Sequence, residues 1–105
     1  MSTRFNRFRD INFLKDTDMI NKEIEIRTPH GLHLRVAAKI VQANKDSKTR
    51  IMFTKDGQTA DASSILELLL LGAGEKSKIQ VTVDGEDVHK AIQDVTEILI
   101  DGAGI

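Results

Sequence analysis

The segment Thr28–Ala38, with the sequence TPHGLHLRVAA, carries the residues best suited to chemistry in this chain. Pro29 and Gly31 interrupt an extended run. Apolar residues then recur at helical spacing, at Leu34, Ala37, Ala38 and Val41. We therefore expect a helix that begins close to His33 and continues to about Lys45.

A histidine at this junction would lie beside backbone N–H groups that have no partner in the first helical turn. These donors and the positive end of the helix dipole favour an anion. Arg35 adds a permanently charged, planar guanidinium within one turn of His33. A neutral imidazole can attack phosphorus, and histidine is largely neutral near neutral pH. The residues predict a phosphate-accepting histidine, with a purely structural helix cap as the alternative.

His30 lies three residues before His33. Two histidines without a strong third ligand nearby make a weak metal site, so we expect no metal here. His30 is instead expected to tune the site by hydrogen bonding, or to compete as a second phosphate acceptor.

A second notable segment is the apolar run that follows Ser64. Ser64 and Glu67 form a capping-box pattern, in which each side chain accepts a hydrogen bond from the other residue's backbone N–H. Gly72 is placed to end this helix. Leu68 and Leu71 have the spacing of core residues, and so many apolar residues in one short helix leave part of its surface exposed.

Composition limits the class of protein. With 105 residues the chain forms one small domain, and its apolar content of 40% and charged content of 30% are ordinary for a soluble protein. The net charge of -1 gives no basic field for nucleic acid or an anionic membrane. The chain has no cysteine, and it shows no signal peptide and no run long enough to insert into a membrane. We expect a cytoplasmic protein.

The remaining pattern predicts a two-layer scaffold. Alternating apolar and polar residues predict four strands, at residues 23–27, 50–54, 58–61 and 78–83. Asp56-Gly57 predicts a hairpin turn, because both residues tolerate positive φ. A last helix follows Gly85, with an apolar stripe of Val88, Ala91, Ile92, Val95, Ile98 and Leu99. Strands with one apolar face imply an α+β two-layer sandwich in the order strand, helix, strand, strand, helix, strand, helix.

Gly31 through Ala38, GLHLRVAA, resembles the active-site signature of the HPr family, whose usual form is Gly-Leu-His-x-Arg-Pro-Ala. These proteins are the histidine-containing phosphocarriers of the bacterial sugar phosphotransferase system. Residues 57–72 resemble the family's second segment at the expected distance, without a gap. The resemblance runs from about Met19 to Leu99, so residues 19–105 are expected to form the domain and residues 1–18 a disordered extension.

The resemblance implies an open-faced sandwich with a four-stranded antiparallel sheet covered on one face by three helices. Val36 departs from the family pattern, which has proline there. Proline would fix φ in the first helical turn, whereas Val36 keeps a backbone N–H that can bind phosphate.

The resemblance also implies a phosphocarrier rather than a stand-alone enzyme, working without a cofactor. His33 would accept a phosphoryl group from phosphorylated enzyme I, ultimately from phosphoenolpyruvate, and pass it to enzyme IIA domains. Ser64 falls at the regulatory serine that HPr kinase/phosphorylase modifies in many members. Ile65, Leu66 and Leu69 match family positions that dock onto enzyme I, enzyme IIA and regulatory proteins.

A second hypothesis keeps the fold and changes the role. The chain would then be a regulatory binding module in carbon or nitrogen control, acting through phosphorylated Ser64 or by docking, with His33 used little. A metal-dependent enzyme is a third hypothesis, which the scarcity of ligands disfavours.

Overall fold

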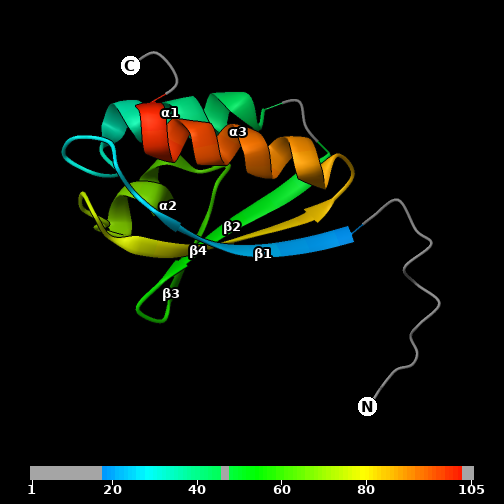
Figure 1. Ribbon diagram of the computed structural model, residues 1–105, viewed down its shortest axis with the longest axis horizontal. Coiled ribbons are helices and arrows are strands. Elements are labelled where there is room, and N and C mark those ends of the chain that lie inside the picture. Colours follow the sequence, from blue (N-terminus) through cyan, green and yellow to red (C-terminus); the bar gives the residue numbers. More distant parts are fainter. Residues whose placement is uncertain (1–17, 46–47, 103–105) are drawn as a thin grey trace.

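The computed structural model describes residues 18–45 and 48–102, which form one antiparallel sheet with three helices on one side (Figure 1). The strands are β1 (Asp18–Glu25), β2 (Thr49–Lys55), β3 (Gln58–Asp61) and β4 (Lys78–Gly85). The helices are α1 (Leu34–Ala43), α2 (Ile65–Leu70) and α3 (Val88–Asp101). The strand order is β1-β4-β2-β3. The predicted fold class and element order are confirmed.

The hairpin between β2 and β3 has the predicted turn. Asp56 and Gly57 both have positive φ, at 51° and 82°, and Lys55 pairs with Gln58 on either side of them. Such a turn matches the twist of the two strands. The pairing places Phe53 opposite Ala60, so both side chains face the core.

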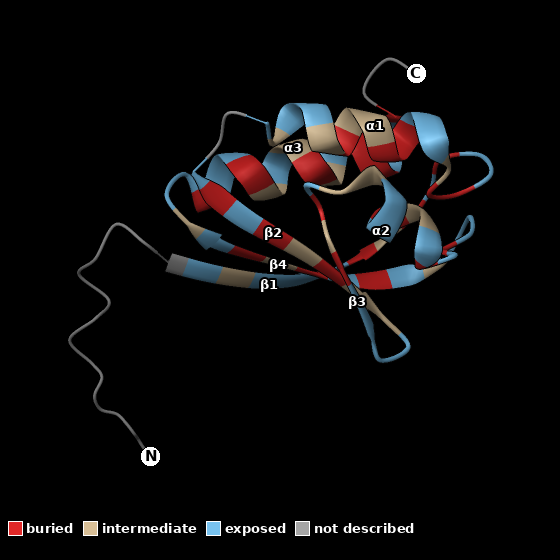
Figure 2. Cartoon of the chain, turned by 180° about the vertical axis from the view of Figure 1, so that it is seen from behind, coloured by how far each residue is buried: buried red, intermediate tan, exposed pale blue. Residues whose placement is uncertain are grey.

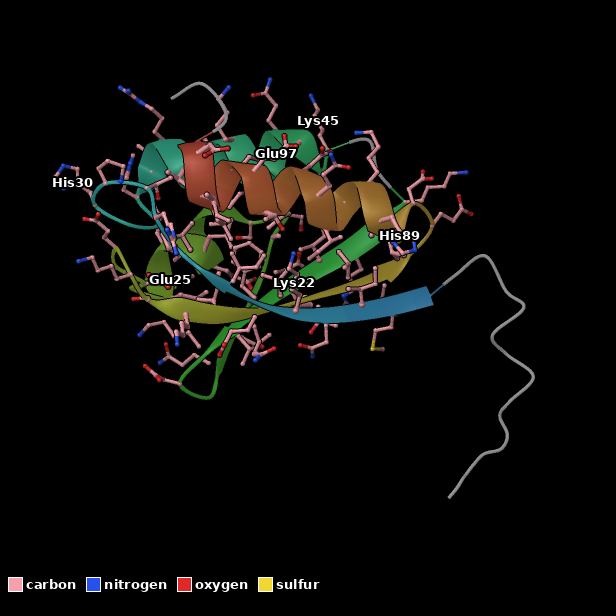
Figure 3. All side chains as sticks on the ribbon, viewed as in Figure 1. Lys22, Glu25, His30, Lys45, His89 and Glu97 are labelled. Carbon is pink, nitrogen blue, oxygen red and sulfur yellow. The ribbon has the colours of Figure 1, made fainter. Side chains whose placement is uncertain are left out.

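Strand β1 is longer than predicted, since it begins at Asp18 and not at 23. Lys22 broke the alternation, because it occupies a position on the apolar face, opposite the buried Val81. The lysine is exposed there because β1 is an edge strand of the sheet, where a long side chain reaches water (Figure 3).

The core lies between the sheet and the helices (Figure 2). Helix α1 buries Val36, Ala37 and Ile40, and α3 buries the predicted stripe except Ile92, which is partly buried. The most deeply buried large side chains come from every layer and include Phe53, Ile26, Ile40, Leu68, Ile79 and Leu99. This packing fixes how α1 and α3 are oriented on the sheet.

The expected extension at residues 1–18 lies outside the described residues, apart from Asp18, which already belongs to β1. It therefore stays a prediction. Within the described residues, none of the helices has the length and apolar character needed to span a membrane.

The loop between β1 and α1 is fastened to the loop that follows α2. Leu32 donates its backbone N–H to the Ala73 carbonyl over 2.9 Å. Gly31 has a φ of +69°, and a Cβ atom there would lie 2.5 Å from the Ala73 oxygen and the Gly74 backbone. Glycine is required at this position both for its backbone conformation and for the close approach.

Substituting Gly31 by alanine should therefore destabilise the fold severely. We expect a loss of roughly 3 kcal/mol, because the strain of a left-handed residue adds to overpacking against a second backbone. Urea unfolding followed by circular dichroism measures the change.

Gly57→Ala is the matched control, since Gly57 also has positive φ, at +82°, but has no neighbour within 4 Å of the added Cβ. It should cost only about 1 kcal/mol. An equal loss in both variants would show that the two loops do not need to approach this closely.

Candidate functional site

His33 is the N-cap of α1, as its position in the sequence predicted. Its backbone is extended, with φ of −96° and ψ of −178°, and its carbonyl accepts the Ala37 N–H over 2.9 Å. Its side chain also caps the helix, because Nδ1 accepts the Arg35 backbone N–H over 3.2 Å. An accepting Nδ1 carries a lone pair, so the proton of the neutral ring resides on Nε2. The lone pair therefore points at the N-terminus of α1.

Three further hydrogen bonds hold the loop before His33. The buried Thr28 donates its hydroxyl to the Gly31 carbonyl over 3.1 Å, and its own carbonyl accepts the Gly31 N–H over 3.0 Å. The His33 N–H binds the Gly31 carbonyl over 3.0 Å. The backbone that presents the imidazole is thus fixed by its own turn.

Arg35 is exposed and makes no ion pair with any described residue. Together with His33 it lines a pocket of about 310 Å³ at the start of α1, which we call the His33 pocket. The pocket is also lined by His30, Val36, Ile100 and Asp101. The Arg35 guanidinium is therefore available to an anion bound in this pocket.

The His33 pocket lies between two helix ends of opposite polarity. It receives the N-terminus of α1, which carries no acidic residue in its first turn, and the last residues of α3. The first end attracts an anion, whereas the C-terminal end of α3 and the Asp101 carboxylate oppose it. The pocket is thus suited to bind a phosphoryl group without holding it strongly.

Val36 is the third residue of α1, and its side chain is fully buried. In this position its N–H has no intrahelical partner, which leaves it free for an anion. Burial of the side chain fastens the first turn to the core. The valine therefore supplies rigidity by packing, where the family's proline would supply it by its ring.

Only one of the two hydrogen bonds of the predicted capping box at Ser64 is present. Ser64 is the N-cap of α2, and its hydroxyl accepts the Glu67 N–H over 3.2 Å. The Glu67 carboxylate, however, accepts the N–H of Asp61 over 2.9 Å, and the Ser64 N–H goes to the Asp61 carbonyl. The reciprocal bond of the capping box is absent because the turn at 61–64 already satisfies the Ser64 donor. The neighbouring Ser63 donates its hydroxyl to the Asp61 carboxylate over 2.7 Å.

The apolar surface of α2 differs in part from the predicted docking set. Leu68 and Leu71 are buried as expected, and Leu66 is 66% exposed. Ile65 and Leu69 are partly buried against the core.

Sequence reasoning missed the exposure of Leu70 at 70% and of Leu34, the first residue of α1, at 62%. Leu70 follows Leu66 by four residues, on the side of the helix opposite Leu68 and Leu71. This spacing could have indicated that Leu70 is exposed. Helices α1 and α2 pack together, and α2 lies at the end of the molecule that carries the start of α1 (Figures 1 and 2). We call Leu34, Leu66 and Leu70 the apolar patch.

His30 is exposed and lies at the same end of the molecule (Figure 3). Its ring centroid is 6.3 Å from that of His33, with the rings edge to face. Among the described residues, no group of three potential metal ligands is found.

Comparisons with known proteins agree with this geometry. The family model described as the phosphorylation site of the PTS HPr component matches residues 20–101. The chain is 34% identical over 80 residues to the phosphocarrier protein HPr of Xylella fastidiosa strain Temecula1. The aligned segment covers 76% of this chain and 90% of that protein.

Two solved structures have the same fold. A phosphocarrier protein HPr from Bacillus anthracis strain Ames superposes with a TM-score of 0.73 at 31% identity, over 77% of this chain and 96% of that chain. HPr-C-His from Thermoanaerobacter tengcongensis superposes with a TM-score of 0.75 at 28% identity, over 82% of this chain and 97% of that chain.

Asp61 should make the stability depend on pH. Hydrogen bonds from the Ser63 side chain and backbone, together with the nearby Arg50, hold its pKa below the ordinary value of 3.8. A lowered pKa means that the stabilisation is fully present above that value and is lost as the pH falls below it. We expect Asp61→Asn to lower the free energy of unfolding at pH 7 by about 1 kcal/mol or less, because solvent screens the interaction.

The measurement is urea unfolding of both proteins between pH 7 and pH 3, with Asp56→Asn as the control at an exposed turn. The difference between the unsubstituted protein and Asp61→Asn should shrink on acidification. A difference that stays constant with pH would contradict the prediction.

Proposed function

Because the chain belongs to the HPr family of phosphotransferase-system phosphocarriers, we propose that His33 accepts a phosphoryl group from phosphorylated enzyme I and passes it to enzyme IIA domains. The observation that supports this most directly is the His33 side chain, whose Nδ1 lone pair faces the N-terminus of α1. Phosphoenolpyruvate is the original donor. The pathway implies a cytoplasmic protein.

The reacting atom in this proposal is Nδ1 of His33. Its lone pair attacks the phosphorus atom, the bond between phosphorus and the donor's nitrogen breaks, and the proton on Nε2 stays in place. The backbone N–H of Arg35, which donates to Nδ1 in the free protein, then donates to a phosphoryl oxygen instead. The first-turn N–H groups of Leu34 and Val36 supply further donors without rearrangement of the helix.

Arg35 is the charged ligand of the phosphoryl group. Its guanidinium makes no ion pair within the described part of the chain, so the side chain does not have to leave an ion pair before phosphate binds. Asp101, on the opposite wall of the His33 pocket, limits the stabilisation. A carrier needs this balance because it must take up and release the group with similar ease.

The apolar patch is proposed to dock successive partners. Leu34, Leu66 and Leu70 expose apolar area close to the N-terminus of α1, and Ile65 and Leu69 border it. Partners that bind there would bring their own histidine close to His33. Burial of apolar side chains on docking supplies affinity without fixed polar contacts, so one surface can serve several partners.

A second candidate function is regulation through Ser64, the modification that HPr kinase/phosphorylase performs in the family. Its support is the partial exposure of Ser64 at the start of α2, next to the apolar patch. A phosphate there would accept hydrogen bonds from the first turn and add negative charge beside the docking surface. It would change partner binding and leave the helix folded.

The phosphoacceptor can be tested directly. The protein is incubated with phosphoenolpyruvate and catalytic enzyme I, and phosphorus NMR detects a base-stable, acid-labile phosphate. We expect full labelling of the unsubstituted protein, no labelling of His33→Ala, and labelling of His30→Ala.

The circular dichroism spectrum of His33→Ala confirms that it is folded, and an HPr of known activity verifies the enzyme I. Labelling that persists in His33→Ala and disappears in His30→Ala would assign the role to His30. If the unsubstituted protein stays unlabelled, the carrier function is wrong.

The docking surface is tested with the double variant Leu66→Ala, Leu70→Ala. Binding to enzyme I should weaken at least tenfold, because each truncation at a docking centre costs about 1 kcal/mol or more. The urea midpoint should change little, since both side chains are already exposed in the free protein. Isothermal titration calorimetry measures the affinity.

Met19→Ala is the matched control, because Met19 is 66% exposed and lies at the start of β1, away from the patch (Figure 1). It should bind normally. Equal binding by all three proteins would remove the patch from the docking site.

Binding to a regulatory partner that survives His33→Ala but changes with Ser64→Asp would favour the second candidate.

A further inference from the structure

We propose that His30 is a second phosphate ligand of the site, which binds as an imidazolium ion, so that protonation of His30 and phosphorylation of His33 favour each other. The inference rests on the proposed function of His33. It makes the phosphoryl affinity of this chain depend on pH near neutrality, because histidine gains its charge in that range.

The first observation is the position of the two rings. Their centroids are 6.3 Å apart and the planes meet at 73°, so the edge of one ring faces the other. Both side chains line the His33 pocket. A phosphoryl group on Nδ1 of His33 would lie in this pocket, where side-chain rotation can bring a His30 N–H to one of its oxygens.

The second observation is the backbone of His30. Its φ is +66°, in the left-handed region, and the next residue, Gly31, is left-handed as well. Asparagine, aspartate and histidine are the non-glycine residues enriched in this conformation. Of these three only histidine can carry a positive charge. Among the described residues Asp56, Lys76 and Asp87 adopt this conformation too, and His30 differs from them in lining the His33 pocket.

The charges around His30 determine the direction of the effect. Arg35 of α1 lines the same pocket and disfavours a second cation, whereas Asp101 of α3 favours it. Glu75 and Lys76, in the loop that packs on Gly31, carry opposite charges. A phosphoryl group brings one to two negative charges, so phosphorylation shifts the balance toward protonated His30.

NMR titration of the unsubstituted protein tests this without any substitution. The midpoint of the His30 ring titration should move up by about half a pH unit on phosphorylation, as expected for a phosphate a few ångströms away in salt solution. His89 is the internal control, since it is also exposed but lies at the opposite end of the molecule (Figure 3). Its midpoint should stay in place.

A competition experiment measures the reciprocal effect. The unsubstituted protein and His30→Asn share limiting phosphoenolpyruvate in one tube with catalytic enzyme I, and mass spectrometry gives the ratio of the two phosphorylated chains. Asparagine tolerates the left-handed backbone but cannot be protonated. By linkage, the ratio should rise about threefold in favour of the unsubstituted protein between pH 8 and pH 6. Competition against His89→Asn should give a flat profile.

The outcomes separate the two proposals. A labelled His33 with an unmoved His30 midpoint, or a flat competition against His30→Asn, overturns the role of His30 and leaves the carrier function intact. Absence of any phosphorylated chain overturns the proposed function and this inference with it.

Discussion

The close approach of two backbones is the constraint on which the site depends. The loop before α1 meets the loop after α2 at Gly31, where there is no room for a Cβ atom, and the Leu32 N–H bonds the Ala73 carbonyl. The contact sets where the chain enters α1, so it also sets the direction of the His33 side chain. Because the second loop follows α2 directly, the same contact places the apolar patch at the end of the molecule that carries the imidazole.

Electrostatic opposition around His33 is the second organising feature. The N-terminus of α1 and the Arg35 guanidinium stabilise an anion, while the C-terminus of α3 and Asp101 destabilise it. These two helix ends lie together because α1 and α3 pack antiparallel on one side of the sheet (Figure 1). A site composed only of cations would bind the phosphoryl group more tightly and release it more slowly. Under the proposed function, the fold therefore affects how readily the phosphoryl group is transferred, in addition to positioning His33.

Much of this arrangement was predictable from local chemistry. Asp56-Gly57 specified its hairpin, because positive φ is a property of those two residues and needs no tertiary contact. The start of α1 was also predictable locally, because Pro29 and Gly31 interrupt the extended run and apolar residues then recur at helical spacing. The early part of β1 was missed because Lys22 lies on the apolar face, and a lysine is tolerated there only at a sheet edge. Edge position depends on the strand order, which alternation does not determine.

Helix α2 shows why the exposed apolar residues were harder to predict than the position of His33. In a six-residue helix with five apolar side chains, composition does not say which of them are buried. Tertiary packing decides, since Leu68 faces the core and leaves Leu66 and Leu70 in solvent. Gly72 then ends the helix, and the following loop is held against Gly31. A rotation of α2 that buried Leu66 and Leu70 would therefore pull that loop away from Gly31, so the exposure of these two leucines is linked to the same contact that presents His33.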